Sequence, residues 1–310
     1  MEVVVPNFGY FAIPNIDKPQ GKRKFLVPRF LSRSKMKKVL ALVGFALIGS
    51  SYALDEYLPV EAKKLEVDVA YGLMNQTGMY DDDGKKQDLA DGSSTMLHTI
   101  PLQLKYGIMP GLDVEVLWAF GILGVKQDAI PTISPEVDTS LTGFGQPEIG
   151  FKYAMMDIGA GAYVNYVLPF ATGDFSDPAP AMALSFGLVY TKLLMPQFNL
   201  TGQLNYRLNF EDEDKFQDGN VITVYAKPEF RFNQFGGAYL GVRYDMTGTD
   251  QADGDDIKNS DGYLVTLAPG WNATWLPTVS TEVNVPLTIL GQNNGASWDI
   301  NAAVYVTLPM

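Results

Sequence analysis

The most constraining feature of this sequence is a run of thirteen residues in which apolar and polar side chains alternate. From Phe198 to Phe210, apart from Gly202, one parity carries Leu, Tyr and Phe, and the other carries Asn, Thr, Gln and Arg. Because successive side chains of a strand point to opposite faces, this run predicts a strand with one oily and one polar face. About eleven residues, tilted near 40°, cross the roughly 25 Å apolar band of an outer membrane. We therefore expect this strand to span lipid.

The same alternation recurs, and we count twelve such stretches between Leu65 and the C-terminus. The long connections are 75–95, 121–142, 171–180, 211–220, 248–260 and 291–296, and the short turns lie near 108–111, 156–158, 193–197, 233–237 and 274–277. Outer-membrane barrels have short periplasmic turns, longer extracellular loops and two aromatic girdles, and the outward aromatic residues here gather at both ends of the stretches. These features favour an all-β fold over a soluble sandwich: a transmembrane antiparallel up-and-down β-barrel of about 12 strands, with both termini in the periplasm.

The composition excludes several classes of protein. The formal net charge is −12, and because residues 1–53 carry nine basic and two acidic side chains (+7), the remainder carries −19. So acidic a body argues against a nucleic-acid partner. The absence of cysteine excludes disulfides. No segment after residue 53 has the long uncharged run of a membrane helix, so the chain can span a bilayer only as a closed barrel.

The N-terminal region resembles a secretory signal. Residues 36–53 place two lysines before an apolar run that ends in Gly, Ser and Ala, which predicts a signal peptide cleaved after Ala53; a buried helix is the alternative. We interpret residues 1–35 as a spurious or disordered extension that precedes the true start methionine, and 54–64 as a periplasmic lead-in. The predicted barrel occupies residues 65–310.

Prolines within the stretches conflict with this scheme, because each removes a ladder hydrogen bond. They mark either bulges or strand ends, and the sequence leaves both open. The prolines are Pro101, Pro147, Pro228, Pro269 and Pro286.

Two motifs point to a known family. The segment LTGFGQPEIGFKY (141–153), followed by VLPFATGD (167–174), resembles the family of outer-membrane transporters named for the MetA pathway of phenol degradation. Here Gln146 replaces the usual Asp of that pattern, and Phe170 and Ala171 lengthen the second motif. The resemblance extends over residues 62–310 and implies an outer-membrane barrel that admits small hydrophobic or aromatic compounds.

The polar parity of the strands predicts a charged lumen, because unpaired charges are tolerated only where water enters. In one interpretation, facing rows of opposite sign select small polar or zwitterionic solutes, and Gly150, Gly161, Gly187 and Gly241 make room for a narrow passage. In the other, the charges pair and fill a closed structural barrel. The predicted pore-lining residues are Lys105, Asp113, Glu115, Glu148, Lys152, Tyr163, Asn165, Arg207, Lys227, Glu229, Arg231, Arg243, Asp245 and Glu282.

Other functions have weaker support. Acidic loops at 81–83, 211–214 and 250–261 suggest calcium sites, but the glycine of the last loop comes too early, so solvated loops are favoured. A hydrolase would need a triad, yet the single histidine, His98, lies on the outward parity and nothing near Ser94 resembles a nucleophile motif. We therefore predict no catalysis, cofactor or metal; the expected partners are outer-membrane lipid, lipopolysaccharide and a small solute.

Overall fold

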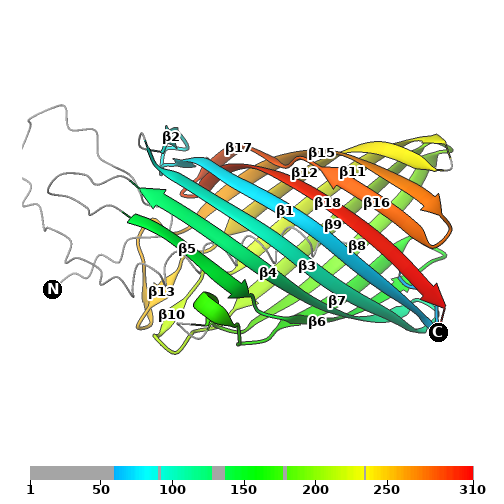
Figure 1. The fold of residues 1–310 in the computed structure, drawn as a ribbon, viewed down its shortest axis with the longest axis horizontal. Helices are drawn as coiled ribbons and strands as arrows, with labels where there is room; N and C mark the ends of the chain where they lie inside the picture. Colours follow the sequence, from blue (N-terminus) through cyan, green and yellow to red (C-terminus); the bar gives the residue numbers. More distant parts are fainter. Residues whose placement is uncertain (1–58, 90–91, 128–136, 177–179, 234, 310) are drawn as a thin grey trace, which may run out of the picture.

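A computed structural model describes residues 59–89, 92–127, 137–176, 180–233 and 235–309, which form a closed antiparallel β-barrel with steeply tilted strands (Figure 1). The predicted N-terminal extension (1–35) and signal peptide (36–53) lie outside the described residues, so both stay predictions. Among the described residues, no helix has the length and hydrophobicity needed to cross a membrane.

Twelve strands form the wall, two of them interrupted. In order they are β1 (Lys64–Tyr80), β3 (Ser94–Met109), β4 (Leu112–Gln127), β5 (Val137–Phe144) continued by β6 (Glu148–Met155), β7 (Ala160–Val167), β8 (Ala183–Met195), β9 (Phe198–Asn209), β11 (Val221–Asn233), β12 (Gly236–Thr247), β15 (Gly262–Leu276), β16 (Val279–Asn284) continued by β17 (Leu287–Gln292), and β18 (Gly295–Pro309). The last strand pairs with the first from Lys64↔Pro309 to Met79↔Gly295 and closes the barrel. The fold class and strand number predicted from the alternation are confirmed.

Several short elements lie in the long loops at one end of the barrel. They are β2 (Lys86–Asp88), β10 (Phe216–Gln217), β13 (Gln251–Ala252), β14 (Asp255–Asp256) and the 3₁₀ turn η1 (Gly173–Phe175). The opposite end carries the tight turns and the last residues of β18 (Figure 1). The described part of the lead-in, residues 59–63, is held at this short-turn end, because the Val60 amide donates to an Asp113 carboxylate oxygen at 3.0 Å.

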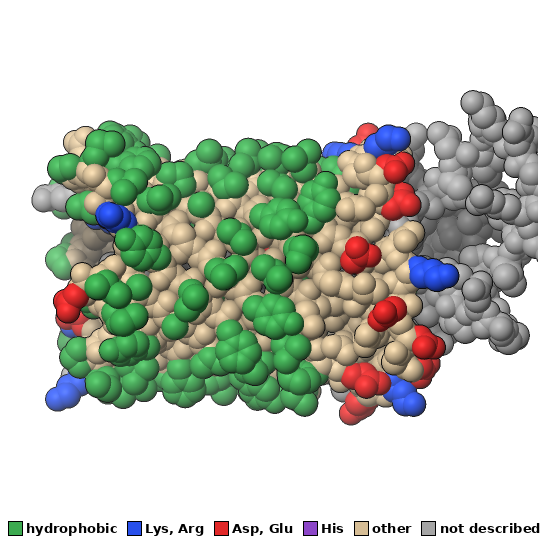
Figure 2. All heavy atoms as spheres, turned by 180° about the vertical axis from the view of Figure 1, so that it is seen from behind, with side chains coloured by type: hydrophobic (Ala, Val, Ile, Leu, Met, Phe, Trp, Pro, Cys, Tyr) green, Lys and Arg blue, Asp and Glu red, His purple; other side chains and the backbone are tan. Residues whose placement is uncertain are grey.

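The outer face is apolar, as the alternation predicts. Hydrophobic side chains cover its middle, and charged side chains gather at the two ends (Figure 2). Leu188 and Leu204, for example, expose 58% and 48% of their surface. This arrangement suits a barrel whose belt contacts lipid tails and whose rims contact headgroups.

Two predicted strand boundaries were wrong. Most of the predicted loop 121–142 is strand, because β4 continues to Gln127 and β5 begins at Val137. The stretch between the short turn near 156–158 and the loop 171–180 ends early, at Val167, so Phe170 lies in the connection that follows it. At both places the chain is apolar on two faces, or rich in Gly and Pro, so the two-residue period is lost.

The prolines mark both kinds of irregularity that the sequence left open. Pro147 and Pro286 lie in the breaks between β5 and β6 and between β16 and β17. The other three lie inside strands beside a gap in a neighbouring ladder. At Pro101, for instance, pairing of β1 with β3 passes from Val69↔Leu102 directly to Gly72↔Thr99. The barrel thus loses ladder bonds on only one side of each of these strands.

One part of the wall is not built from paired strands. Among the described strands β5 pairs with β4 alone, and its other edge meets residues 168–176, which we call the strap. The Thr172 amide donates to the Phe144 carbonyl at 2.9 Å, and the Phe144 amide donates to the Thr172 hydroxyl at 3.1 Å. The Thr142 amide donates to an Asp174 carboxylate oxygen at 2.9 Å. A Cβ at Gly143 would lie 2.0 Å from the Thr172 carbonyl oxygen, so this approach requires glycine.

Candidate functional site in the barrel lumen

The predicted pore-lining residues all lie on the parity that faces away from lipid. Half of them are buried, with Lys105 and Asp113 exposing 1% and 0% of their surface, and six more are half-buried. Arg231 is the exception, because its side chain is 53% exposed near the short-turn end of β11. The structure therefore brings these residues together inside the barrel, whereas their role in lining a conducting pore stays a prediction.

Five of the six predicted inward basic groups pair with acidic groups close by rather than standing in facing rows, whereas the Arg207 guanidinium donates to the Asn209 side chain at 2.9 Å. The Lys105 ammonium lies 2.8 Å from an Asp68 carboxylate oxygen and 3.2 Å from one of Glu66. The Arg243 guanidinium lies 2.6 Å from Asp245. The remaining pairs are Lys152 with Asp113, Lys227 with Glu282, and Arg231 with Glu229. The predicted transverse field is therefore largely neutralised by local pairing.

The ion pairs form a belt around the inner wall, and uncharged polar groups extend this belt through hydrogen bonds. The Gln103 amide donates to Glu115 at 3.1 Å, and the Asn165 amide donates to Glu148 at 2.5 Å. The Gln203 amide donates to the Tyr163 hydroxyl at 2.6 Å. These bonds satisfy groups that would be costly to bury alone.

The inward glycines do not widen the lumen as expected. A Cβ at Gly187 would meet the Tyr163 ring at 1.9 Å, and one at Gly241 would meet the Tyr225 hydroxyl at 2.8 Å. At Gly150 the nearest atoms belong to the Asn165 and Glu115 side chains. The space that each of these three glycines leaves is taken by a neighbouring side chain lying against the wall. This part of the prediction was wrong, because a ring on an adjacent strand covers the bare backbone.

A cavity of about 160 Å³ remains beside the belt. It lies among β1, β3, β4, β11, β12 and β15 to β18, and both charged and apolar groups line it. Its polar lining includes Tyr225, Tyr239 and Asn301. Asp299 lines it as well, and one carboxylate oxygen of Asp299 accepts no hydrogen bond from the described residues. The cavity thus combines ring surfaces with an acidic group in its lining.

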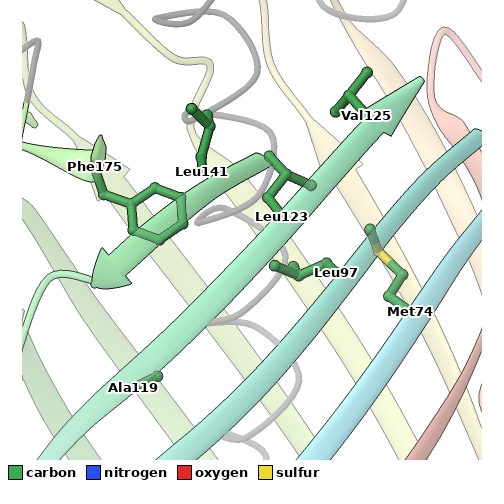
Figure 3. Close-up of a cluster of buried hydrophobic side chains, with 7 residues drawn as sticks. All are labelled: Met74, Leu97, Ala119, Leu123, Val125, Leu141 and Phe175. Carbon is green, nitrogen blue, oxygen red and sulfur yellow. The ribbon is translucent and has the colours of Figure 1, made fainter. Parts of the chain in front are cut away.

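The inner wall is apolar near the long loops, which the sequence analysis missed. Register places Met74, Leu97, Leu123 and Leu141 side by side across β1, β3, β4 and β5. Phe175 of the strap packs against this row and is 3% exposed (Figure 3). We call these five residues the apolar row. Both faces of the wall are apolar here, so the sequence lacks the alternation that would have revealed the row.

The acidic loops are held by hydrogen bonds. Asp250 accepts from the Gly219 amide at 2.8 Å, and burial raises the pKa of its carboxyl to about 7. Burial likewise raises the pKa of Asp218 to about 6. Asp81 is exposed and accepts from the Lys85 amide at 2.7 Å, a bond that holds its pKa below the usual value. Over the described ranges, no cluster of His, Cys, Asp and Glu side chains is arranged to hold a metal ion.

The single histidine has no catalytic setting in the part of the chain that the structure describes. His98 lies on the outward parity of β3, where its Nδ1 is 2.8 Å from the Tyr71 hydroxyl. The two rings are tilted, with centroids 6.1 Å apart. This contact is typical of an interfacial imidazole rather than of a general base beside a nucleophile.

A closed twelve-stranded wall, an apolar outer belt and a polar inner belt together define an outer-membrane β-barrel. The family is shown by sequence: a model described as "Putative MetA-pathway of phenol degradation" matches residues 75–284, and the chain belongs to that family. The resemblance seen in the two motifs is thereby confirmed. No curated protein matches the chain.

Solved structures support the same fold. The COG4313 outer membrane channel from Pseudomonas putida F1 is 13% identical, with a TM-score of 0.69 over 82% of this chain and 98% of that chain. The transport unit of the autotransporter AIDA-I from Escherichia coli is 13% identical, with a TM-score of 0.51 over 88% and 98%. At such identities the likeness shows the architecture, and it agrees with an outer-membrane location.

Proposed function

We propose that this barrel is a passive channel that admits small solutes across the outer membrane, small hydrophobic or aromatic compounds among them. The observation that carries this proposal is the luminal cavity of about 160 Å³, lined by both charged and apolar groups. A cavity of about this size has room for a benzene ring. The relative from Pseudomonas putida F1 is named a channel, and the family is named for phenol degradation, so both names agree with the proposal.

The lining favours a ring that carries a polar group. Tyr225 and Tyr239 offer ring surfaces, and the Asp299 carboxylate lies in the same lining. A hydroxyl or amine on the solute would donate a hydrogen bond to this acceptor. Because Arg243 and Lys227 already pair with Asp245 and Glu282, the cavity presents little free positive charge to a carboxylate solute.

A closed structural barrel is the second candidate, and the paired belt favours it. Five of the inward basic groups are paired with acids in the structure. Neighbouring side chains also occupy the room beside Gly150, Gly187 and Gly241. In this alternative the polar interior only stabilises the wall, and no solute crosses.

Single-channel recording in planar bilayers decides between the two candidates. We expect the purified barrel to conduct, and Arg243→Glu to shift ion selectivity toward cations more than Arg231→Glu does. Arg243 lines the cavity with a side chain 14% exposed, whereas the Arg231 side chain is 53% exposed near the end of the barrel. Arg243→Gln serves as the uncharged control, and heat-modifiable migration verifies folding of each variant. Absence of conductance at every voltage would establish the structural barrel.

A further inference from the structure

We propose that the five short turns of the barrel bind the inner, phospholipid leaflet of the outer membrane, at the boundary between its headgroups and its acyl chains. The inference goes beyond the proposed channel function and does not depend on it. It rests on the composition of the turns, the contrast between the two ends of the barrel, the length of the apolar outer face, and the distribution of apolar side chains around the barrel end.

Every short turn exposes large apolar side chains. Each turn carries at least two of them, and each of these residues exposes between 44% and 63% of its surface. We call them the apolar rim: Ile108, Met109, Met155, Met156, Ile158, Leu193, Leu194, Met195, Phe232, Phe235, Trp275 and Leu276. The backbone of a turn favours Gly, Pro, Asn or Asp, and it does not require Met or Leu. Large exposed apolar surfaces mark sites of contact with a protein or a membrane.

The short turns differ from the long loops in charge. Asp157 is the only charged residue of the five turns in the sequence. The turns comprise residues 108–111, 155–158, 193–197, 232–235 and 275–277. The long loops are acidic instead, at 81–83, 211–214 and 250–261. Figure 2 shows the same contrast, because hydrophobic side chains continue to the short-turn end, at the left of the view, whereas Asp and Glu side chains gather at the opposite end.

The membrane is thick enough to reach the rim. Tyr244 and Tyr263 stack with centroids 6.0 Å apart near the long-loop ends of β12 and β15, where they belong to one aromatic girdle. Going from Tyr244 back to Phe235, nine residue steps at a tilt near 40° cover about 23 Å. The apolar band of an outer membrane is roughly 25 Å thick, so a band that begins at this girdle extends to the turn before β12.

Two side chains at this end suit a lipid headgroup boundary. Trp275 is 61% exposed, and its indole nitrogen donates to the Thr281 hydroxyl at 2.9 Å. Its ring also packs edge-on against Trp271, with centroids 6.2 Å apart. Trp is enriched at such boundaries because its ring is apolar and its N–H is polar. The exposed Lys192 beside the turn 193–197 can extend its ammonium to a lipid phosphate.

Apolar groups occur on every side of the short-turn end, which identifies the partner. The five turns join β3 to β4, β6 to β7, β8 to β9, β11 to β12 and β15 to β16. A second copy or another protein would contact one side of the barrel end, whereas a lipid leaflet contacts all sides. The rim also continues the outer face that meets acyl chains, because the exposed Leu188 and Tyr190 of β8 lead down to Leu194. The lipid leaflet is therefore the partner that fits.

Depth-dependent fluorescence quenching tests this placement. The chain has no native cysteine, so Met156→Cys and Leu194→Cys each give one site, in different turns, for the dye bimane. Each labelled barrel is reconstituted into phospholipid vesicles whose acyl chains carry bromine either near the headgroup or deep in the bilayer. We expect the shallow bromines to quench both labels by about half, and more than the deep bromines do, because the rim lies at the boundary. Iodide in the water should quench these labels only weakly.

Two further positions calibrate the measurement. Leu188→Cys lies on the outer face of β8 between the two ends, so deep bromines should quench its label more than shallow ones do. Lys258→Cys, an exposed position in the loop 248–260, should be quenched by iodide and by neither brominated lipid. Heat-modifiable migration verifies that each labelled variant is folded, and two rim positions are used so that one folded variant suffices.

Three results would overturn the proposal. Rim labels that iodide quenches and neither lipid does would place the turns in water. Stronger quenching by the deep bromines would place the turns inside the apolar band instead of at its boundary. Rim labels protected from iodide and from both lipids would mean that protein covers the turns, as in a contact between two copies. The channel proposal is tested separately, because the labels report position whether or not the barrel conducts.

Discussion

The barrel wall closes in two ways, and the contrast shows how stability is divided within it. Between β18 and β1 a ladder runs from Lys64↔Pro309 to Met79↔Gly295, with one irregularity between Gln76 and Gly78. Between β5 and the strap, three hydrogen bonds and one buried ring hold the edge. Both arrangements cover a strand edge, as a membrane barrel requires. The first is a long backbone ladder, whereas the second relies largely on side chains, so we expect the second to open locally before the barrel unfolds.

The largest expected effect comes from breaking the β18 seam. Val304→Pro removes a backbone donor and places a rigid ring in a strand paired with β1 on one side and β16 on the other. Since proline in a central strand costs about 3 kcal/mol or more, we expect little folded barrel. Heat-modifiable migration after refolding into detergent measures the folded fraction.

The matched change at the strap should be tolerated. In Thr142→Pro the lost amide is the one that donates to Asp174, so no bond between β5 and β4 is removed. We expect normal folding yield with faster proteolysis of the strap. Equal loss of folding in both variants would show that the two edges are equally part of the cooperative fold.

The next effect concerns the buried charge beside the seam. Lys105 bridges from β3 to Asp68 and Glu66 on β1. Lys105→Met leaves these buried carboxylates without this partner, which should lower the free energy of unfolding by about 3–5 kcal/mol. Lys85→Met, in an exposed pair with Asp83, should change it by less than about 0.5 kcal/mol. Urea unfolding in detergent micelles measures both, and similar small changes would mean that the lumen is fully hydrated.

A smaller and local effect is expected from Phe175→Ala. The ring is 3% exposed within the apolar row, so its loss should lower the local stability of the strap by about 3 kcal/mol. The urea midpoint of the whole barrel should stay within experimental error, because the strap lies outside the ladder. Hydrogen exchange of residues 168–176 measures the local change, with Leu188→Ala on the lipid face as the control. A shifted midpoint would place the strap in the global fold.

The two edges also differ in how far the sequence predicts them. Alternation identified the strands of the β18 seam, because one face meets lipid and the other meets a charged lumen. The same signal failed for β5 and for the inward residues Leu97 and Leu123, whose outer neighbours are also apolar. A two-residue period is present only in strands that have one apolar and one polar face.

Individual roles required the structure. The sequence flagged Gln146 as a departure from the family pattern, but the carbonyls that it binds come from Leu168 and Ala181, which only the fold brings together. The pairing of Lys227 with Glu282 likewise joins strands far apart in the chain. Alternation predicted that charges of both signs face inward, whereas their local pairing depends on strand register.

The contact between the loops 211–220 and 248–260 should give the smallest change in stability, and that change depends on pH. The pKa of Asp250 is raised to about 7 by burial, so the folded loop holds its proton at pH values where an unfolded carboxyl has lost it. A raised pKa means stability that is complete below the unfolded value near 4 and declines as the pH rises through 7. Asp218, with a pKa raised to about 6, acts in the same direction.

We therefore expect hydrogen exchange of these loops to be slower at pH 5 than at pH 8. Exchange rates must first be corrected for the intrinsic effect of pH. Asp250→Asn keeps an acceptor for the Gly219 amide and removes the titrating group, so most of the dependence should vanish and the part due to Asp218 should remain. Loops that become better protected at pH 8 would reverse the assigned sign. Unchanged dependence in the variant would assign the pH effect to Asp218.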